Sequence, residues 1–360
     1  MMKSLDKLGT INRGRSRHRP RNDESLYNGE YPFVQTGDIK NSELHILKHG
    51  QTYNEKGLSQ SKLWPKGTLC ITIAANIAET AVLSYDACFP DSVVGFIADE
   101  KKSDVYYVKY SIDYLKTKLQ QVSKGTTQDN LSLDKLLGFG FDIPEVKNQR
   151  RISNILLGYD FLIENNTRRI AILEESAQRL YREWFVHFRF PGHEKAKMVE
   201  SELGPIPKGW QPRQLGSILE FKYGKGLRKE DRVSGDFPVY GSSGIVDYHS
   251  DYLVEGPGII VGRKGNVGST FLSESCFYPI DTVYYVESNL DVYYLFYLLS
   301  NMTFISGDTA VPGLSRESTM GTVVLLPDKS SISEFGRIVG SLLKQKSTLE
   351  NKEHQPSQNA

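Results

Sequence analysis

The sequence predicts a mixed α/β (α+β) protein with two similar domains, separated by two long helices that form an antiparallel coiled coil. Three observations support this prediction. Short motifs recur in the same order in the two halves of the 360 residues, which indicates an internal duplication. Short strand-like runs bounded by Gly, Pro and Asp precede a helical segment in each half. Each half ends in a run of apolar residues at heptad spacing.

The duplication is visible in four pairs of motifs. YPFV at 31–34 recurs as FPVY at 237–240, and Asn76 with Thr80 recurs as Asn266 with Thr270. CFPD at 88–91 recurs as CFYPID at 276–281, and IP at 143–144 recurs as LP at 326–327. Because the order is kept while the spacing drifts, we expect two copies of one domain with loop insertions and deletions.

The elements of each copy follow from local patterns. Strands are expected at 69–73, 81–85 and 92–97, and again at 258–261, 270–272 and 282–286. Helices are expected at 105–121 and 292–299. The predicted domains are 1–145 and 191–328, with a long spacer helix over 146–190, a second spacer helix over 329–353 and a polar tail over 354–360.

The two long helices carry an apolar seam that steps alternately by four and three residues, the a/d spacing of a coiled coil. Asn166 is the polar member of this seam, and a buried Asn commonly fixes the register. The alternative is that each helix packs only on its own domain. The predicted seam residues are Ile152, Leu156, Tyr159, Ile163, Asn166, Ile170, Leu173, Ala177 and Leu180 in the first helix and Phe335, Val339 and Leu342 in the second.

Composition excludes several classes of protein. Lys and Arg number 44 against 43 Asp and Glu, so a polyanion partner must be met by local basic patches. The three cysteines lie far apart and form no cluster with histidine, which argues against a structural zinc site and fits a reducing cytoplasm. No apolar run predicts a signal peptide or a membrane span. Walker, dinucleotide-binding and [ND]PP[YF] motifs are absent, so no catalytic site is predicted.

Several stretches carry a family resemblance. Residues 143–194 begin with IPEVKNQRRISNILLGYDF and are followed by LGPIPKGW at 203–210. QTGDI stands at 35–39, GRKGNVG at 262–268 and GTTQDNL at 125–131. Nearly the whole chain resembles the specificity (S) subunits of type I restriction–modification systems. One departure is that the second helix is shorter than the first, so the coiled coil is expected to be asymmetric.

The resemblance implies a non-catalytic, cytoplasmic and nucleoid-associated subunit of a bacterial or archaeal complex. Each domain is then a target recognition domain that reads one half of a bipartite, asymmetric double-stranded DNA target, and the helices set the gap. Two methyltransferase (M) subunits and the restriction (R) subunits are the implied partners. S-adenosylmethionine, ATP and Mg²⁺ are expected on those partners, and no cofactor and no metal on this chain.

Five arginines alternate with other residues near the N-terminus, and no acidic residue stands among them. In a strand, this alternation places all five on one face, where they form a strip that binds DNA phosphates. A basic cluster recurs in the second half. The alternative for both is a solvated basic loop. The first set is Arg13, Arg15, Arg17, Arg19 and Arg21, and the second is Lys222, Tyr223, Lys225, Arg228 and Lys229.

Further DNA-contact candidates are polar residues in turns. Gln and Asp can pair with adenine and cytosine edges, although a role in forming the turn or capping a helix is equally possible. Arg263 and Lys264 lie in a Gly-rich turn that can contact the DNA backbone or be a plain hairpin turn. The remaining candidates are Gln35, Thr36, Asp38, Lys124, Thr126, Thr127, Gln128, Asn130, Tyr240, Ser242, Ser243, Ser315 and Arg316.

Two other functions are also compatible with the sequence. The chain could be a stand-alone nuclease or modification enzyme with a cryptic site, which the absent motifs disfavour. It could also be a coiled-coil scaffold without a DNA role, which the paired basic clusters disfavour. The aromatic residues that end the first long helix, Trp184, Phe185, Phe188 and Phe190, are expected to pack on the second domain or, alternatively, to dock a partner.

Overall fold

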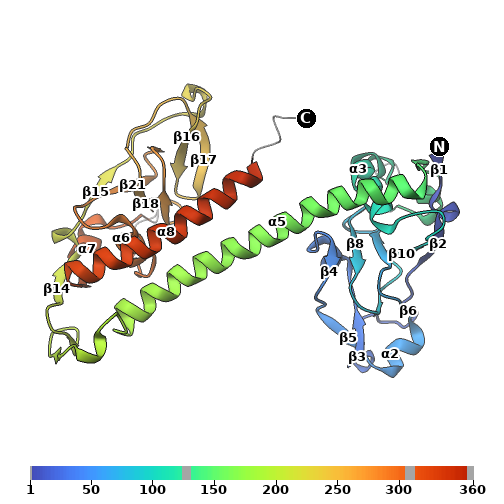
Figure 1. The fold of residues 1–360 in the computed structure, drawn as a ribbon, viewed down its shortest axis with the longest axis horizontal. Coiled ribbons are helices and arrows are strands. Elements are labelled where there is room, and N and C mark those ends of the chain that lie inside the picture. The colour runs from blue at the N-terminus through green and yellow to red at the C-terminus, as the bar shows by residue number, and fades with distance from the viewer. Residues whose placement is uncertain (1, 124–130, 305–312, 355–360) are drawn as a thin grey trace. The chain divides into compact units, whose positions relative to one another are not determined.

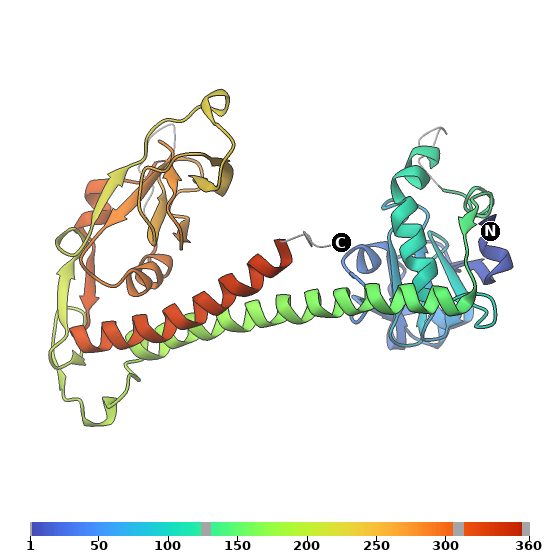
Figure 2. The same cartoon turned by 45° about the horizontal axis from the view of Figure 1, so that its top comes forward.

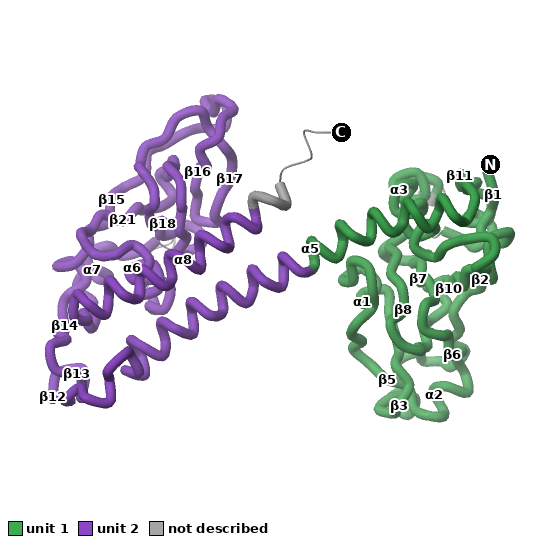
Figure 3. Tube along the Cα trace, viewed as in Figure 1, with its two compact units in different colours: residues 1–164 green, residues 165–360 purple. Residues whose placement is uncertain are grey.

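A computed structural model describes residues 2–123, 131–304 and 313–354. The chain forms two compact units, Met1–Glu164 and Asn165–Ala360 (Figure 1, Figure 3). The boundary lies within the longest helix, so each unit contains part of that helix.

Unit 1 is built on two sheets. The five-stranded sheet has the order β2 (Gly9–Arg13), β10 (Val93–Ala98), β7 (Leu69–Thr72), β8 (Thr80–Leu83) and β4 (His45–Ile46). The four-stranded sheet has the order β5 (Gln51–Tyr53), β3 (Tyr27–Phe33), β9 (Ala87–Cys88) and β6 (Leu63–Trp64), and β1 (Met2–Lys3) pairs with β11 (Phe141–Asp142). The helices before the long helix are α1 (Thr36–Lys40), α2 (Glu55–Gln60), α3 (Val105–Ser123) and α4 (Leu133–Leu137).

Unit 2 has a four-stranded sheet in the order β15 (Glu220–Tyr223), β21 (Val283–Glu287), β18 (Gly258–Gly262) and β19 (Thr270–Ser273). A second sheet has the order β17 (Gly244–His249), β16 (Phe237–Gly241) and β20 (Tyr278–Pro279). Two strand pairs complete the unit, β14 (Gln211–Gln214) with β22 (Val323–Leu326) and β12 (Met198–Val199) with β13 (Ile206–Pro207). Its shorter helices are α6 (Val292–Ser300) and α7 (Arg316–Gly321).

The two units repeat one topology. The order β2-β10-β7-β8 in unit 1 corresponds to β15-β21-β18-β19 in unit 2, and all of these neighbours pair antiparallel. The six predicted strands and the two predicted helices end within two residues of the observed elements. The α/β fold class with two similar domains is thus confirmed.

The β7–β8 turn carries the duplication down to backbone conformation. Ala75 and Ala78 have φ of 63° and 61°, and Gly265 and Gly268 have φ of 77° at the corresponding places of the β18–β19 turn. Positive φ is costly for a residue with a Cβ and free for glycine. Unit 1 therefore has the same turn conformation as unit 2, although it has alanine at the two positions where unit 2 has glycine.

The core of unit 1 lies between the five-stranded sheet and α3. Leu69, Ile71 and Phe96 from the sheet are fully buried, and they belong to one cluster with Val108 and Ile112 of α3. These side chains lie on one face of the sheet and recur every three to four residues along the helix. The alternate residues Cys70 and Val93 are buried in a second cluster, so the central strands are buried on both faces.

The two long helices have nearly the predicted bounds. α5 runs over Val146–Tyr181 and continues in a π-helical turn, Arg182–Val186, while α8 runs over Lys329–His354. Asp328 precedes α8 and its carboxylate accepts the backbone N–H groups of Ser330 and Ser331, both at 3.0 Å. The indole of Trp210, from the LGPIPKGW stretch, donates to the same carboxylate at 3.0 Å. This cap explains why α8 begins at Lys329.

Within unit 2, α8 packs antiparallel on the C-terminal half of α5 (Figure 1, Figure 2). Phe335 near the start of α8 contacts Trp184 near the end of α5, with ring centroids 6.0 Å apart. Lys346, later in α8, forms an ion pair of 2.6 Å with Glu174, earlier in α5. Ala177, Phe335 and Val339 are fully buried, as the predicted seam requires, and the half-buried Leu342 is next to the buried Leu343.

The first part of the predicted seam is not buried. Ile152, Leu156, Tyr159 and Ile163 are 37–62% exposed. The register of the two helices gives the reason, because it brings the end of α8 at His354 opposite Asn166. Asn166, Ile170, Leu173 and Leu180 are half-buried. The helical pairing is therefore shorter than the sequence predicts.

The aromatic end of α5 is part of the unit 2 core. Trp184 and Phe185 are buried, and Phe185 contacts Phe335 and Trp210 at centroid distances of 5.1 and 5.8 Å. Phe188 and Phe190 also pack against Trp210, at 5.5 and 5.1 Å. The expectation that these aromatics pack on the second domain holds, and they are not a free docking patch.

Candidate nucleic-acid interface

In each unit, two loops lie close together at one edge of the antiparallel sheet, the edge at which the strands end. In unit 1, β2 ends at Arg13 opposite Val94, and β7 ends at Thr72 opposite Val93, so the chain that follows each strand leaves from the same edge. The chain at Leu131 also returns to this edge, because its backbone N–H donates to Ile73 at 2.9 Å. The same bond joins Leu314 to Arg263 in unit 2, at 2.9 Å.

The arginine strip of unit 1 is a folded loop and not a continuous strand. Only Arg13 belongs to β2, so the prediction that alternation places five arginines on one face is wrong. The loop turns because Gly14 and Arg15 donate their backbone N–H groups to Val93 and Phe89, at 2.8 and 3.0 Å. A carbon at the Gly14 Cβ position would lie 2.3 Å from a neighbouring carbonyl oxygen, so only glycine fits there.

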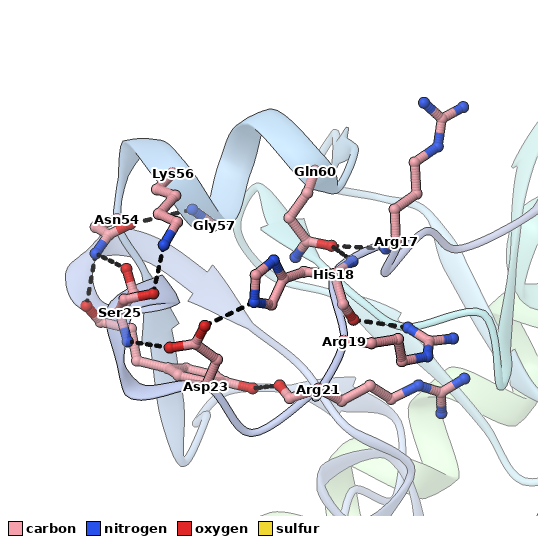
Figure 4. A network of polar contacts seen from close by, with 11 residues as sticks. Arg17, His18, Arg19, Arg21, Asp23, Ser25, Asn54, Lys56, Gly57 and Gln60 are labelled. Carbon is pink, nitrogen blue, oxygen red and sulfur yellow. Dashed lines mark hydrogen bonds and ion pairs between the residues drawn. The ribbon is translucent and has the colours of Figure 1, made fainter.

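Most of these arginines are used within the protein. Arg21 binds the Asp91 carboxylate at 2.7 and 2.9 Å, and the Arg13 Nε donates to the Asp91 carbonyl at 3.0 Å. Arg19 donates to the carbonyls of Ser16 and His18, both at 2.8 Å, and the Arg15 Nε is buried. Arg17 is exposed, and its guanidinium has no hydrogen bond or ion pair with any residue in the described ranges (Figure 4).

His18 and Asp23 close the same loop. The His18 Nε2 lies 2.6 Å from the Asp23 carboxylate, which also accepts the backbone N–H of Ser25 at 2.9 Å. These bonds, first those from Ser25 and then that from His18, lower the pKa of Asp23 to about 2. Asp23 is therefore charged at neutral pH and holds the loop from one side.

In unit 2, as in unit 1, some of the predicted cations are paired within the protein and others are exposed and unpaired. Lys222 contacts Glu220 and Glu287 at 2.8 and 3.5 Å, and Arg316 contacts Glu220 at 3.0 Å. The hydrogen bond from Lys222 lowers the pKa of Glu220. These four charges, two of each sign, therefore largely neutralise one another at the surface.

Arg263 lies 5.1 Å above the ring of the exposed Tyr223 and donates to the Asp281 carbonyl at 2.9 Å. Four other cations are exposed, and their charged groups form no hydrogen bond or ion pair within the described part of the chain. They are Lys225, Arg228, Lys229 and Lys264.

The turn residues have mostly structural roles. Gln35 and Asp38 form a capping box at the start of α1, where Thr36 is the first residue, and the Gln35 amide donates to Gln51 at 2.5 Å. The Ser242 carbonyl accepts from Ser269 at 2.7 Å, whereas Ser243 is exposed.

Tyr240 and Ser315, two more of the predicted contact residues, have structural roles. Tyr240 is 6% exposed in a core cluster with Phe277 and Val283, so its choice as a DNA contact is wrong. Ser315 caps α7 by accepting the backbone N–H of Ser318. Lys124, Thr126, Thr127, Gln128 and Asn130 lie outside the described residues.

Two residues that sequence reasoning missed hold the cationic loops. Gln60, at the end of α2, accepts two backbone N–H groups of the arginine loop. Arg232 plays a comparable part in unit 2, where it contacts Asp247 and the Leu227 carbonyl. No sequence pattern indicates Gln60, because its partners lie more than 40 positions away along the chain.

Comparison with known proteins identifies the family. The model of the type I restriction modification DNA specificity domain matches residues 1–175 and 207–352. The chain belongs to this family. It is 28% identical over 206 residues to the MjaIX specificity subunit of Methanocaldococcus jannaschii, covering 56% of this chain and 48% of that protein. The chain thus aligns with about half the length of this relative.

Two other similarities extend over more of the chain. The EcoprrI specificity subunit of Escherichia coli is 21% identical over 306 residues, which covers 80% of this chain and 74% of that protein. The crystal structure of the type I S subunit from M. genitalium superposes with a TM-score of 0.70 at 17% identity, covering 98% of this chain and 91% of that one. At this identity the likeness concerns the fold alone.

Within the residues that the structure describes, no helix is both long and apolar enough to cross a membrane. In the same residues, no three or more His, Cys, Asp or Glu side chains gather as metal ligands would. That this chain binds no cofactor stays a prediction.

Proposed function

We propose that this chain is the DNA sequence-specificity subunit of a type I restriction–modification complex and is itself non-catalytic. The observation that carries the proposal is the pair of cationic loops at the same sheet edge of two like units. Five exposed cations have charged groups that form no hydrogen bond or ion pair in the described ranges: Arg17 in unit 1 and Lys225, Arg228, Lys229 and Lys264 in unit 2. Such cations bind phosphates, and arginine also pairs with guanine edges.

The target is bipartite and asymmetric under this proposal. The two units share a topology, yet their loops differ: residues 13–21 carry five arginines, whereas residues 222–232 carry lysines, arginines and two acids. Different loops on one scaffold read different bases. Each unit would read one half of the target, and α5 with α8 would set the gap between the halves.

The partners we propose are two methyltransferase subunits and the restriction subunits, in a cytoplasmic complex on the nucleoid. S-adenosylmethionine, ATP and Mg²⁺ would be bound by those partners. The apolar face of α5 offers a docking surface for a methyltransferase subunit, because it continues the seam that α8 covers farther along the helix. It consists of Ile152, Ile155, Leu156, Tyr159, Leu162 and Ile163, which are 37–62% exposed.

The test of DNA reading is co-expression with a methyltransferase subunit, followed by long-read mapping of methylated adenines in the host DNA. We expect one split motif with two specified halves and a fixed gap. Exchanging residues 1–145 for those of another specificity subunit should change one half only. A stable complex that methylates no such motif would contradict the proposal.

The test of docking is co-purification of the methyltransferase subunit with a variant of the apolar face. The pair Leu156→Glu and Tyr159→Glu places two charges on this face and should abolish co-purification. The matched control, Asn154→Glu and Asn165→Glu, adds the same charge at exposed polar positions of α5 and should co-purify normally. Equal recovery with both pairs would refute the assigned surface.

A further inference from the structure

The arginine loop of unit 1 is fixed to the end of α2 by side chains. The Gln60 Oε1 accepts the backbone N–H of Arg17 at 2.6 Å and that of His18 at 3.0 Å. The next residue, Ser61, is buried and donates its hydroxyl to the Arg15 carbonyl at 2.8 Å. Two adjacent side chains thus bind three residues of a loop that lies more than 40 positions away in sequence.

The rest of the loop is closed by its own side chains. His18 contacts Asp23 at 2.6 Å, and the Arg19 guanidinium turns back to the carbonyls of Ser16 and His18. In Figure 4 the Arg17 side chain extends away from this network while its backbone is held by Gln60. The loop therefore has a fixed backbone at Arg17 and a free guanidinium.

Unit 2 fixes its cationic loop at the corresponding place by different chemistry. Gly224 and Lys225 repeat the backbone bonds of Gly14 and Arg15, donating to Val283 and Pro279 at 3.2 and 3.0 Å. Counting onward, Leu227 takes the place of Arg17. Its carbonyl accepts from the half-buried Arg232 at 3.3 Å, and Arg232 is held by Asp247 at 3.1 Å. The next two residues are the exposed Arg228 and Lys229.

We propose that Gln60 and Arg232 are positioning residues for DNA reading, each acting through the cations of its own loop and therefore on its own half of the target. The inference rests on the proposed function. Its physical basis is preorganisation: a flexible loop loses conformational freedom when it binds, whereas a loop already held in place does not. Recognition of a base edge also requires placement to within about 0.5 Å, which an unanchored backbone cannot provide.

The experiment uses the full chain in complex with its methyltransferase subunit and the duplex target mapped for the wild-type complex. Two further duplexes carry a scrambled first or second half. The measured quantity is discrimination, the ratio of affinities for the intact and the scrambled duplex. Gln60→Leu keeps the size of the side chain and removes the acceptor. Gln60→Asn, which keeps the amide but shortens its reach, is the second variant, and Ser59→Ala on the same helix is the control.

We expect Gln60→Leu and Gln60→Asn to lower discrimination at the half read by unit 1 on the order of 5- to 50-fold. The other half should be read as in the wild type, and Ser59→Ala should change neither. Arg232→Met should lower discrimination at the half read by unit 2 and leave the half read by unit 1 unchanged. The slope of log affinity against log salt should stay unchanged for Gln60→Leu, which removes no charge, and fall by about one for Arg17→Ala, which removes one cation from the DNA interface.

A double-mutant cycle decides whether Gln60 acts through Arg17. In the Arg17→Ala background, Gln60→Leu should cause no further loss of discrimination. Losses that multiply, losses equal at both halves, or no loss at all would overturn the positioning role. A wild-type complex that fails to discriminate intact from scrambled duplexes would instead refute the proposed function.

Discussion

The length of α5 should determine the gap between the two halves of the DNA target. The perturbation is deletion of residues 166–172, which lie in the part of α5 paired with α8. The deletion keeps the heptad seam in phase, because Leu173 then follows Ile163 by three positions, an a-to-d step. Tyr159 and Ile163 then take the places of Asn166 and Ile170 opposite the last two turns of α8, near Leu349.

The magnitude follows from helix geometry. Seven residues at about 1.5 Å each shorten α5 by about 10.5 Å. At about 3.4 Å per base-pair step, this corresponds to at most about three base pairs, and to fewer if the helix is inclined to the DNA axis. Removing seven residues rotates the two ends of the helix relative to each other by only about 20°. Removing three base pairs rotates the two halves of the DNA target relative to each other by about 105°. We therefore expect a gap shorter by one to three base pairs, together with weaker methylation.

The assay is mapping of methylated adenines in cells that express the shortened chain with its methyltransferase subunit. The control replaces residues 166–172 with seven alanines, which keeps the length of α5 and should keep the gap. An unchanged gap in the deletion variant, or a change in the specified bases themselves, would refute the reasoning that the helix acts as a spacer.

Three further predictions concern the stability of unit 2. Burial raises the pKa of Asp328, but hydrogen bonds from Ser330, Ser331 and Trp210 outweigh it and hold the value at about 2, below the ordinary 3.8. This lowered pKa means that the cap stabilises the fold above about pH 4 and is lost as pH falls toward 2. Asp328→Ala should therefore cost about 1–2 kcal/mol in urea unfolding at pH 7 and much less at pH 2.5; an equal cost at both would contradict the cap. Gly268→Ala should cost about 2–4 kcal/mol, because its Cβ would lie 2.5 Å from the Phe304 ring at a positive φ; Gly67→Ala, at a similar φ but in open space, should cost only about 1. Phe335→Ala should cost about 3–5 kcal/mol by thermal or urea unfolding, since this buried ring contacts Tyr181, Trp184, Phe185 and Tyr297; a loss below 1 kcal/mol would show that the helix pairing contributes little.

Local patterns of the sequence predicted the elements well. The heptad spacing predicted α5 within a few residues at its C-terminal end, and the runs bounded by Gly and Pro predicted β7, β10 and β18. These predictions succeed because buried side chains recur every two residues along a strand and every three to four residues along a helix. The spacing of apolar residues in the sequence therefore indicates the type of element. The recurring motifs likewise indicated the duplication that the strand order displays.

The site was predicted less well, for an identifiable reason. Alternation in sequence suggested a strand through Arg21, but Gly14 turns the chain after Arg13 and the loop folds onto Asp91 and Gln60. Charge in sequence also does not show which cations are already paired. Arg21 and Lys222 meet carboxylates within the protein, whereas Arg17 and Arg228 do not within the described residues.

The fold class, the duplication, the long helices and the family can be predicted from the amino-acid sequence, because these depend on periodicity and on motifs that are local along the chain. The extent to which α8 covers α5, the cations that stay unpaired and the fixing of the loops by Gln60 and Arg232 become visible only in the folded chain. Those features depend on contacts between residues far apart in sequence. Their formation depends on the packing of whole strands and helices, so no local pattern records them.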